Sequence, residues 1–185
     1  MTVSQTVANS TFDNDALIAT NKINALSNID ATAKTAAITN VQNAQAAAKQ
    51  AVAAATNTND ITAAQAAGQT KEAQIASDAV LDDAALQQTN IIGALKNLGD
   101  NQQKAIDQVN ADRDSAKAKV AATTTPAMAQ SGEQNVVLVI ARDGDQIVLA
   151  DYAQAAQNRI AALPDLKDDQ ISQATAGITN ALQTG

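Results

Sequence analysis

The sequence contains no cysteine and no histidine, and its only aromatic side chains are Phe12 and Tyr152. Disulfide bonds and metal sites built on thiolate or imidazole ligands are therefore excluded, and so is catalysis that depends on either side chain. The absence of cysteine permits export from the cell without requiring it.

Positive charge is also scarce, because 12 Lys and Arg face 19 Asp and Glu, which gives a net charge of −7. This acidic balance disfavours nucleic acid and anionic membranes as partners. No apolar run is long enough to span a bilayer, and residues 1–10 lack the apolar stretch of a signal peptide. If the protein is exported, we therefore expect this chain to be a fragment of a larger one.

Alanine dominates what remains. It supplies more than half of the hydrophobic fraction of 45%, and it is the strongest helix former. Leu, Ile, Val and Phe together make up about a fifth of the chain, close to the level at which disorder is expected, but the net charge is too modest for a disordered chain. The composition predicts helices with thin, alanine-packed cores, each marginally stable alone.

The strongest signal is an internal repeat. Residues 16–29 match residues 85–98 at eight of fourteen positions, and part of the motif returns at 158–166. Farther along, Lys49 and Val52 correspond to Lys117 and Val120. We predict a disordered segment over 1–11, copy one over 12–80, copy two over 81–148 and a truncated copy three over 149–185.

Each copy is predicted to contain three helices. In the first helix, apolar residues recur at every third position, as at Ile23, Leu26 and Ile29, and so form a stripe on one helical face. The second and third helices carry apolar or small residues at spacings of three and four, which suits packing along a seam. The predicted fold is all-α: tandem three-helix bundles joined end to end in an elongated, spectrin-like rod.

Helix boundaries are also visible in the sequence. Thr125 followed by Pro126 is typical of a helix start, whereas Gly99 is predicted to end one helix and Asp100 to cap the next, with Gln103 completing a capping box. Between copies one and two no proline occurs from 72 to 98, so the third helix of copy one is predicted to continue into the first helix of copy two.

Residues 135–150 leave two alternatives open. Their β-branched runs on either side of Asp143-Gly144-Asp145 are typical of a β-hairpin with an Asp-Gly turn. The repeat instead predicts a helix that breaks at Gly144, with three extra residues inserted within 142–147.

Copy one carries the pattern Ala33-Lys34…Ile38…Ala48-Lys49…Val52, followed by Ile61, Ala64, Gly68 and Ile75. This pattern resembles the helical repeat of unknown function found in tandem arrays in cell-wall-anchored surface proteins of Gram-positive bacteria, giant staphylococcal matrix-binding adhesins among them. Copy two departs from it by lacking the glycine. The resemblance implies an extracellular, surface-exposed stalk that takes part in adhesion or biofilm formation, and it brings no catalytic residues.

Several residues are candidates for functional sites. The carboxylate pairs Asp82-Asp83 and Asp168-Asp169 could serve acid–base or metal chemistry, but neighbours on a helix diverge, so solvated or helix-dipole roles are favoured. Asp143 and Asp145 supply only part of a calcium loop. The apolar run 136–140 is either a partner-binding patch or, as favoured, a well-filled core, and Gly68 and Gly93 are candidates for close helix crossings.

We therefore predict no catalytic, cofactor or metal residues, and no enzyme. The predicted function is a structural spacer, stalk or adhesive repeat of a bacterial cell surface, whose neighbours are the adjacent repeats. Two alternatives are a module that binds a host serum or matrix protein through an exposed helix face, and an intracellular or stress-related helical protein that is largely disordered alone.

Overall fold

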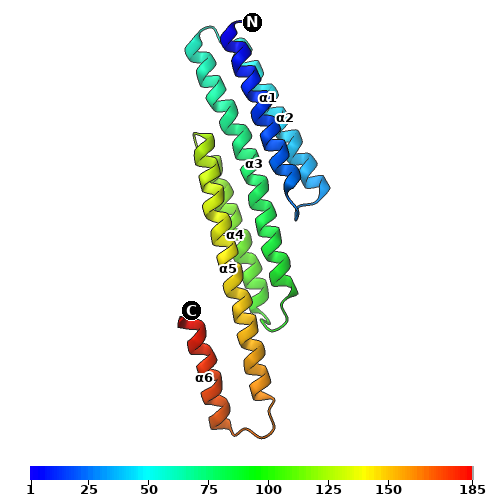
Figure 1. The fold of residues 1–185 in the computed structure, drawn as a ribbon, viewed down its shortest axis with the longest axis vertical. Helices are drawn as coiled ribbons and strands as arrows, with labels where there is room; N and C mark the ends of the chain where they lie inside the picture. Colours follow the sequence, from blue (N-terminus) through cyan, green and yellow to red (C-terminus); the bar gives the residue numbers. More distant parts are fainter. Residues whose placement is uncertain (185) are drawn as a thin grey trace.

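The computed structural model describes residues 1–184 and consists of six α-helices joined by short loops (Figure 1). No strand occurs among these residues, so the predicted all-α class is confirmed. The helices are α1 (Val3–Ala25), α2 (Ala31–Ala54), α3 (Thr58–Ala94), α4 (Asn101–Ala121), α5 (Pro126–Ala161) and α6 (Asp168–Thr184).

The helices form three groups that share the two long helices. The first helix group contains α1, α2 and the first half of α3, and the second contains the second half of α3, α4 and the first half of α5. In the third helix group, the C-terminal part of α5 packs against α6. All six helices follow the long axis of an elongated molecule (Figure 1).

The predicted continuity across the first copy boundary is confirmed, because α3 runs unbroken from Thr58 to Ala94. Its middle contributes to two cores. Ala76 and Ala79 pack in the first helix group, whereas Leu81 and Ala85, a few residues later, pack in the second. The two groups consequently overlap along α3, with α5 beginning beside the middle of that helix, rather than meeting end to end (Figure 1).

The first group is built around Phe12, which is fully buried beside Ala48 and Val52. A Cβ atom added to Gly68 would lie 2.5 Å from the Ala48 Cβ atom and 2.7 Å from the Phe12 ring. The glycine therefore makes room for the aromatic ring. In the second group, Leu81 takes the place of Phe12 and Val136 takes the place of Gly68. The smaller leucine side chain there leaves room for the larger valine.

A second glycine accommodates a polar side chain in the same way. A Cβ atom on Gly144 would lie 1.9 Å from Oε1 of Gln88, which is 8% exposed. The first group has Ala19 and Ala76 at these two places. Gly144 is thus a close-packing residue within α5. Residues 135–150 are helical, as the repeat predicts, and the hairpin alternative is wrong. The predicted break at Gly144 is also wrong, because α5 continues through this residue.

The continuity of α5 also corrects the alignment of the copies. The N-caps Asn57 and Thr125 are 68 positions apart, as are Asp83 and Asp151, so no three-residue insertion separates the copies. Within the apolar run 136–140, Ile140 is buried, whereas Leu138 is 69% exposed. The prediction that this run fills a core is correct only for its inward-facing residues.

The N-terminal segment differs from expectation as well. Residues 3–11 are helical rather than disordered, because Thr2 and Gln5 form a capping box that starts α1. Ala8 is fully buried in the first core, so this segment contributes packing as well as local hydrogen bonds.

One predicted helix start is confirmed and the other is only partly correct. The Thr125 side chain accepts a hydrogen bond from the backbone N–H of Met128 at 3.2 Å, with Pro126 in the first turn. Asp100 does precede α4, but its side chain makes no capping hydrogen bond. α3 ends at Ala94, and Gly99 lies in the following loop with a positive φ of 54°.

Substitution of Gly68 tests the packing of the first core. We expect Gly68→Ala to lower the free energy of unfolding by about 1–3 kcal/mol, because the added methyl group overlaps two side chains. The matched control is Gly93→Ala, since a Cβ atom there meets nothing within 4 Å. That change should raise stability by about 0.5–1 kcal/mol through helix propensity. Urea titrations measure both effects, and an unchanged stability for Gly68→Ala would contradict the packing described.

Candidate functional site at the junction of the helix groups

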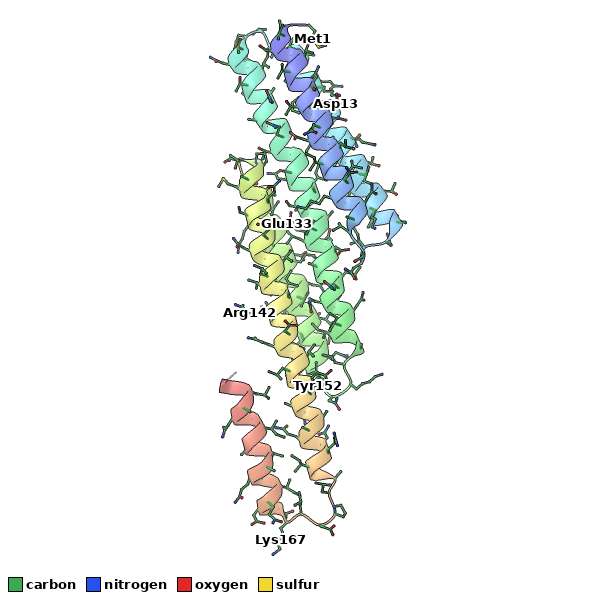
Figure 2. All side chains as sticks on the ribbon, in the orientation of Figure 1. Met1, Asp13, Glu133, Arg142, Tyr152 and Lys167 are labelled. Carbon is green, nitrogen blue, oxygen red and sulfur yellow. The ribbon has the colours of Figure 1, made fainter. Side chains whose placement is uncertain are left out.

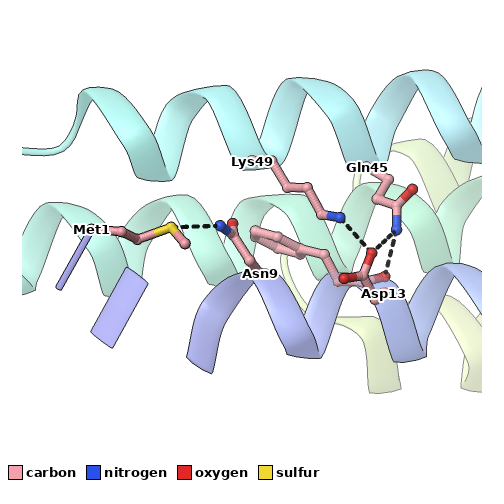
Figure 3. A network of polar contacts seen from close by, with 6 residues as sticks. Met1, Asn9, Asp13, Gln45 and Lys49 are labelled. Atoms are coloured by element: carbon pink, nitrogen blue, oxygen red, sulfur yellow. Dashed lines mark hydrogen bonds and ion pairs between the residues drawn. The ribbon is translucent and has the colours of Figure 1, made fainter. Parts of the chain in front are cut away.

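Polar contacts between helices recur in both complete groups. In the first group, Lys49 and Gln45 on α2 both reach the carboxylate of Asp13 on α1 (Figure 3). The equivalent residues in the second group are Lys117, Arg113 and Asp82. There the Lys117 ammonium lies 2.7 Å from the Asp82 carboxylate, and the Arg113 guanidinium lies 3.6 Å from it.

Side chains also donate hydrogen bonds to the backbone carbonyl groups at helix ends, and these contacts recur with the repeat. Lys34 donates to the backbone carbonyls of Asn24 and Leu26, which end α1. Gln102, which lies 68 positions after Lys34, donates to the carbonyls that end α3, at 2.8 Å for both Ile92 and Leu95. Because the last turn of a helix leaves carbonyls without intrahelical partners, each contact stabilises a chain reversal.

A similar pair serves the other end of each group. Gln5 donates to the carbonyl of Val52 at 3.1 Å, and Gln74 donates to the carbonyls of Ala121 and Thr123 at 3.2 and 3.1 Å. Gln5 and Gln74 are 69 positions apart, so this contact also recurs with the repeat.

The most specific recurring contact is an aspartate clamp, by which we mean Asp83 with Asn28 and Asp151 with Asn97. Asp83 accepts the backbone N–H groups of Asn28 and Ile29 at 2.6 and 3.0 Å, and also the Asn28 side chain at 2.9 Å. Asp151 accepts the backbone and side-chain N–H groups of Asn97 at 2.7 and 3.1 Å. Each clamp fixes a loop to the long helix that passes it.

The clamp hydrogen bonds also set the charge state of Asp83. Burial alone would raise the pKa of this carboxyl group, but the hydrogen bonds from Asn28 and Ile29 outweigh burial and lower the pKa below its ordinary value. The contact of Asp83 is therefore an ionised, charge-assisted one at neutral pH.

One ion pair joins the first and second helix groups directly. The ammonium group of Lys22 on α1 lies 2.6 and 2.8 Å from the two carboxylate oxygens of Glu133 on α5. Glu133 is labelled in Figure 2. The Glu133 side chain is only 7% exposed, whereas Lys22 is 34% exposed, so the carboxylate end of the pair is shielded from solvent. It fixes where the start of α5 lies against the first group.

Beside this pair, a hollow of about 160 Å³ is lined by residues of α1, α3 and α5, including Glu72. Glu72 is 1% exposed, and neither of its carboxyl oxygens has a hydrogen-bond partner among the described residues. Burial and the nearby charge of Asp15 raise the pKa of Glu72 to about 7. The equivalent residue of the second group is Ile140, so a carboxyl group here occupies a core position.

On the other side of α3, an open groove of about 740 Å³ runs between α2, α3 and the end of α4. Its floor consists largely of alanine and isoleucine, and charged residues lie at its edge. One of these, Asp78, is half-buried, and burial raises its pKa, although Lys117 partly offsets that effect. Since Lys117 is paired with Asp82, the groove offers an apolar surface rather than a set of reactive groups.

The carboxylate pairs weighed from the sequence serve structural roles. Asp82 and Asp83 diverge as expected, one toward α4 and the other toward the α1–α2 loop, but neither is simply solvated. Asp168 and Asp169 lie exposed in the first turn of α6, where their negative charge interacts favourably with the helix dipole.

The remaining candidates likewise do not converge. Asp143 pairs with its neighbour Arg142 within α5, and Asp145 is exposed on the same helix, so the two are not part of a loop. Across residues 1–184, no group of three or more Asp and Glu side chains is placed to hold a metal ion. No helix in that range is both long and apolar enough to cross a membrane. Gly68 does mark a close helix crossing, whereas Gly93 does not.

Comparison of the chain with protein-family models, curated proteins and solved structures found no match. The family resemblance drawn from the sequence pattern therefore stays a prediction, and function must be argued from the contacts themselves.

Two features of the junction escaped sequence reasoning. The clamps could have been predicted from the sequence, because their four residues match between copies of the repeat. These residues are Asp83, Asp151, Asn28 and Asn97. The burial of Glu72 was not predictable, because the predicted three-residue insertion aligned Glu72 with Val137. Without that insertion, Glu72 aligns with the core residue Ile140.

Replacing Glu72 tests whether a carboxyl group is buried in this core. The unfolded chain loses the Glu72 proton near its ordinary pKa of 4.5, but the folded chain keeps it up to about 7. Stability should therefore fall as the pH rises through this window, by about 3 kcal/mol in full. We expect Glu72→Ile, which copies Ile140, to remove this loss and to stabilise the protein at pH 8.

Urea titrations between pH 4.5 and 8 measure this difference. Asp145→Asn is the matched control, because it removes an exposed carboxylate from a helix. If Glu72→Ile and the parent protein show parallel stability profiles across the window, the carboxyl group is not buried as described.

Proposed function

We propose that the chain is a non-catalytic structural spacer or stalk from a bacterial cell-surface protein, built from tandem three-helix bundle repeats with the boundaries 12–80, 81–148 and 149–185. The observation that carries this proposal is the recurrence of the aspartate clamp. Its partners are about 55 residues apart in sequence, and both of them shift by 68 or 69 positions from one copy to the next. Composition alone does not produce such a pair of matched long-range contacts.

The action of such a stalk is mechanical. In repeat proteins each unit packs against its neighbours, so the number of units sets the reach of the chain. Here the units share a helix, and bending at the junction would require breaking that helix together with the Lys22–Glu133 ion pair. The proposed stalk is therefore stiff.

Because the units overlap, the proposed stalk is shorter than one built from the same number of residues in end-to-end bundles. The two clamps hold loops at Asn28 and Asn97. The Asn28 loop lies beside Asp83 of α3, whereas the Asn97 loop lies just beyond the end of α3. About twelve residues of α3 separate these levels, so each copy advances the structure by about 18 Å. End-to-end bundles would advance by the length of a whole helix such as α1, about 35 Å. In this respect the proposed stalk differs from a spectrin-like rod.

Placement on a cell surface, and the roles in adhesion and biofilm formation, rest on the resemblance of copy one to cell-wall repeats. The contacts described above bear on the spacer architecture only.

A protein-binding module is the second candidate, and exposed apolar residues on α1 favour it. Leu17 and Ile18 are 58% and 56% exposed, and Leu86, the equivalent of Leu17, is 38% exposed. Leucine is thus exposed at the same position of two copies, and exposed apolar side chains form partner surfaces where they lie together in a patch. Saturable binding to a host serum or matrix protein, lost in Leu17→Ser together with Ile18→Ser, would favour this function over a spacer.

Lengthening the chain by one unit tests the spacer proposal. Duplicating residues 81–148 in frame should increase the maximum dimension in solution by about 18 Å, because the new unit shares a helix with each neighbour. Small-angle X-ray scattering measures this dimension for the parent and the extended protein.

A flexible Gly/Ser segment of equal length, appended at the C-terminus, is the control for added chain without an added unit. As a random coil it should extend the maximum dimension by about 45 Å, well beyond the increase expected for a folded unit. An increase near zero, as in a compact globule, would contradict the spacer. An increase near 35 Å would contradict the shared-helix overlap instead.

A further inference from the structure

The third helix group leaves open a face that the other two groups cover. Four positions of the first helix of each copy point into its group. In the first and second groups all of these side chains are at most 8% exposed. In the third group none is buried, and Leu149 is 49% exposed. The three sets are Phe12, Ala16, Ala19 and Ile23; Leu81, Ala85, Gln88 and Ile92; and Leu149, Ala153, Ala156 and Ile160.

The structure itself shows what covers such a face. In the first group the cover is the first half of α3, through residues such as Ile61 and Gly68. In the second group it is the first half of α5, through Ala129 and Ile140. Among the described residues, the third group has only α5 and α6, which are joined by contacts such as the 3.1 Å hydrogen bond from Gln157 to Thr179.

The open face extends past the end of the second group. Tyr152 and Leu163 are 68% and 51% exposed, and Tyr152 lies where α5 passes the ends of α3 and α4 (Figure 2). On α6, Ile171 and Ile178 are only half-buried. A two-helix hairpin with apolar side chains on one side lacks the third element that would shield them.

We propose that the open face of α5 and α6 docks a separate amphipathic helix with the apolar pattern of residues 126–151. This helix takes the place that the first half of α5 takes in the second group. The inference rests on the proposed repeat architecture, since it assumes that the third group is a copy of the first two.

The side chains of the open face specify which helix fits best. Leu149 matches Leu81, whose neighbour on the covering helix is Val136, rather than Phe12, which requires Gly68. Ala156 matches Ala19, whose neighbour is Ala76, rather than Gln88, which requires Gly144. The best occupant therefore has valine at the position of Val136 and alanine at the position of Gly144.

Peptide binding to the full chain tests this specificity. The probe is a fluorescently labelled peptide of residues 126–151, titrated with the intact protein and followed by anisotropy, with circular dichroism to detect helix formation on binding. The Gly144→Ala peptide should bind about fivefold more tightly, because one more methyl group is buried. A peptide of residues 58–83 should bind more weakly than either, because Gly68 leaves space beside Leu149.

Variants of the protein locate the site. Leu149→Asp should abolish binding of the peptide, and its fold is preserved because Leu149 is half exposed without a partner helix. Leu17→Asp is the matched control, since it places the same charge at a 58% exposed leucine on α1 and should leave binding unchanged. Thermal melts of both variants verify their folding.

Three results would overturn the proposal. They are the absence of saturable binding, equal binding to the Leu149→Asp variant, and a dimer of the protein alone that Leu149→Asp dissociates, which would make a second copy the occupant. Failure of the spacer proposal is recognised separately, because the scattering experiment uses no added peptide.

Discussion

The middle of α3, residues 72–83, must serve two cores at once, and the rest of the structure follows from that constraint. One side of this stretch carries Ala76 and Ala79 into the first group, while Leu81 and Ala85 begin the second core. A helix can do this only if it has no breaker and if small side chains lie where neighbouring helices approach closely, as Ala73, Ala76 and Ala79 do. The high alanine content meets both requirements, because alanine favours the helix and occupies little space.

Small residues leave little apolar area to bury, so polar contacts between side chains and loops largely determine how the helices lie against one another. Clamps, helix-end contacts and the Asp13 and Asp82 networks hold loops and helices in register, and each recurs with the repeat. Where the copies differ, they differ in matched pairs, as with Gly68 beside Phe12 and Gly144 beside Gln88. Glu72 is an exception, because its buried carboxyl oxygens have no hydrogen-bond partner among the described residues.

The sequence was sufficient to predict the helical class, the uninterrupted helix through residues 72–94 and the start of α5. These features depend on local propensity and on a spacing that can be counted. Local propensity left a helix and a hairpin open for residues 135–150, and it did not predict that the helix continues through Gly144, where Gln88 of another helix packs closely. The overlap of the groups was missed for a similar reason: Lys22 and Glu133 are more than a hundred residues apart, and nothing local marks them as partners.

The central claim is that one uninterrupted helix is shared by two adjacent cores. Native-state hydrogen exchange on α3 tests it most directly, because it reports how often each backbone hydrogen bond opens. The account predicts that the amides of residues 76–85, covered from both groups, exchange most slowly in the helix, and that protection declines toward Thr58 and Ala94. Rapid exchange in the middle, between two protected ends, would reveal a hinge between independent units and would contradict the account.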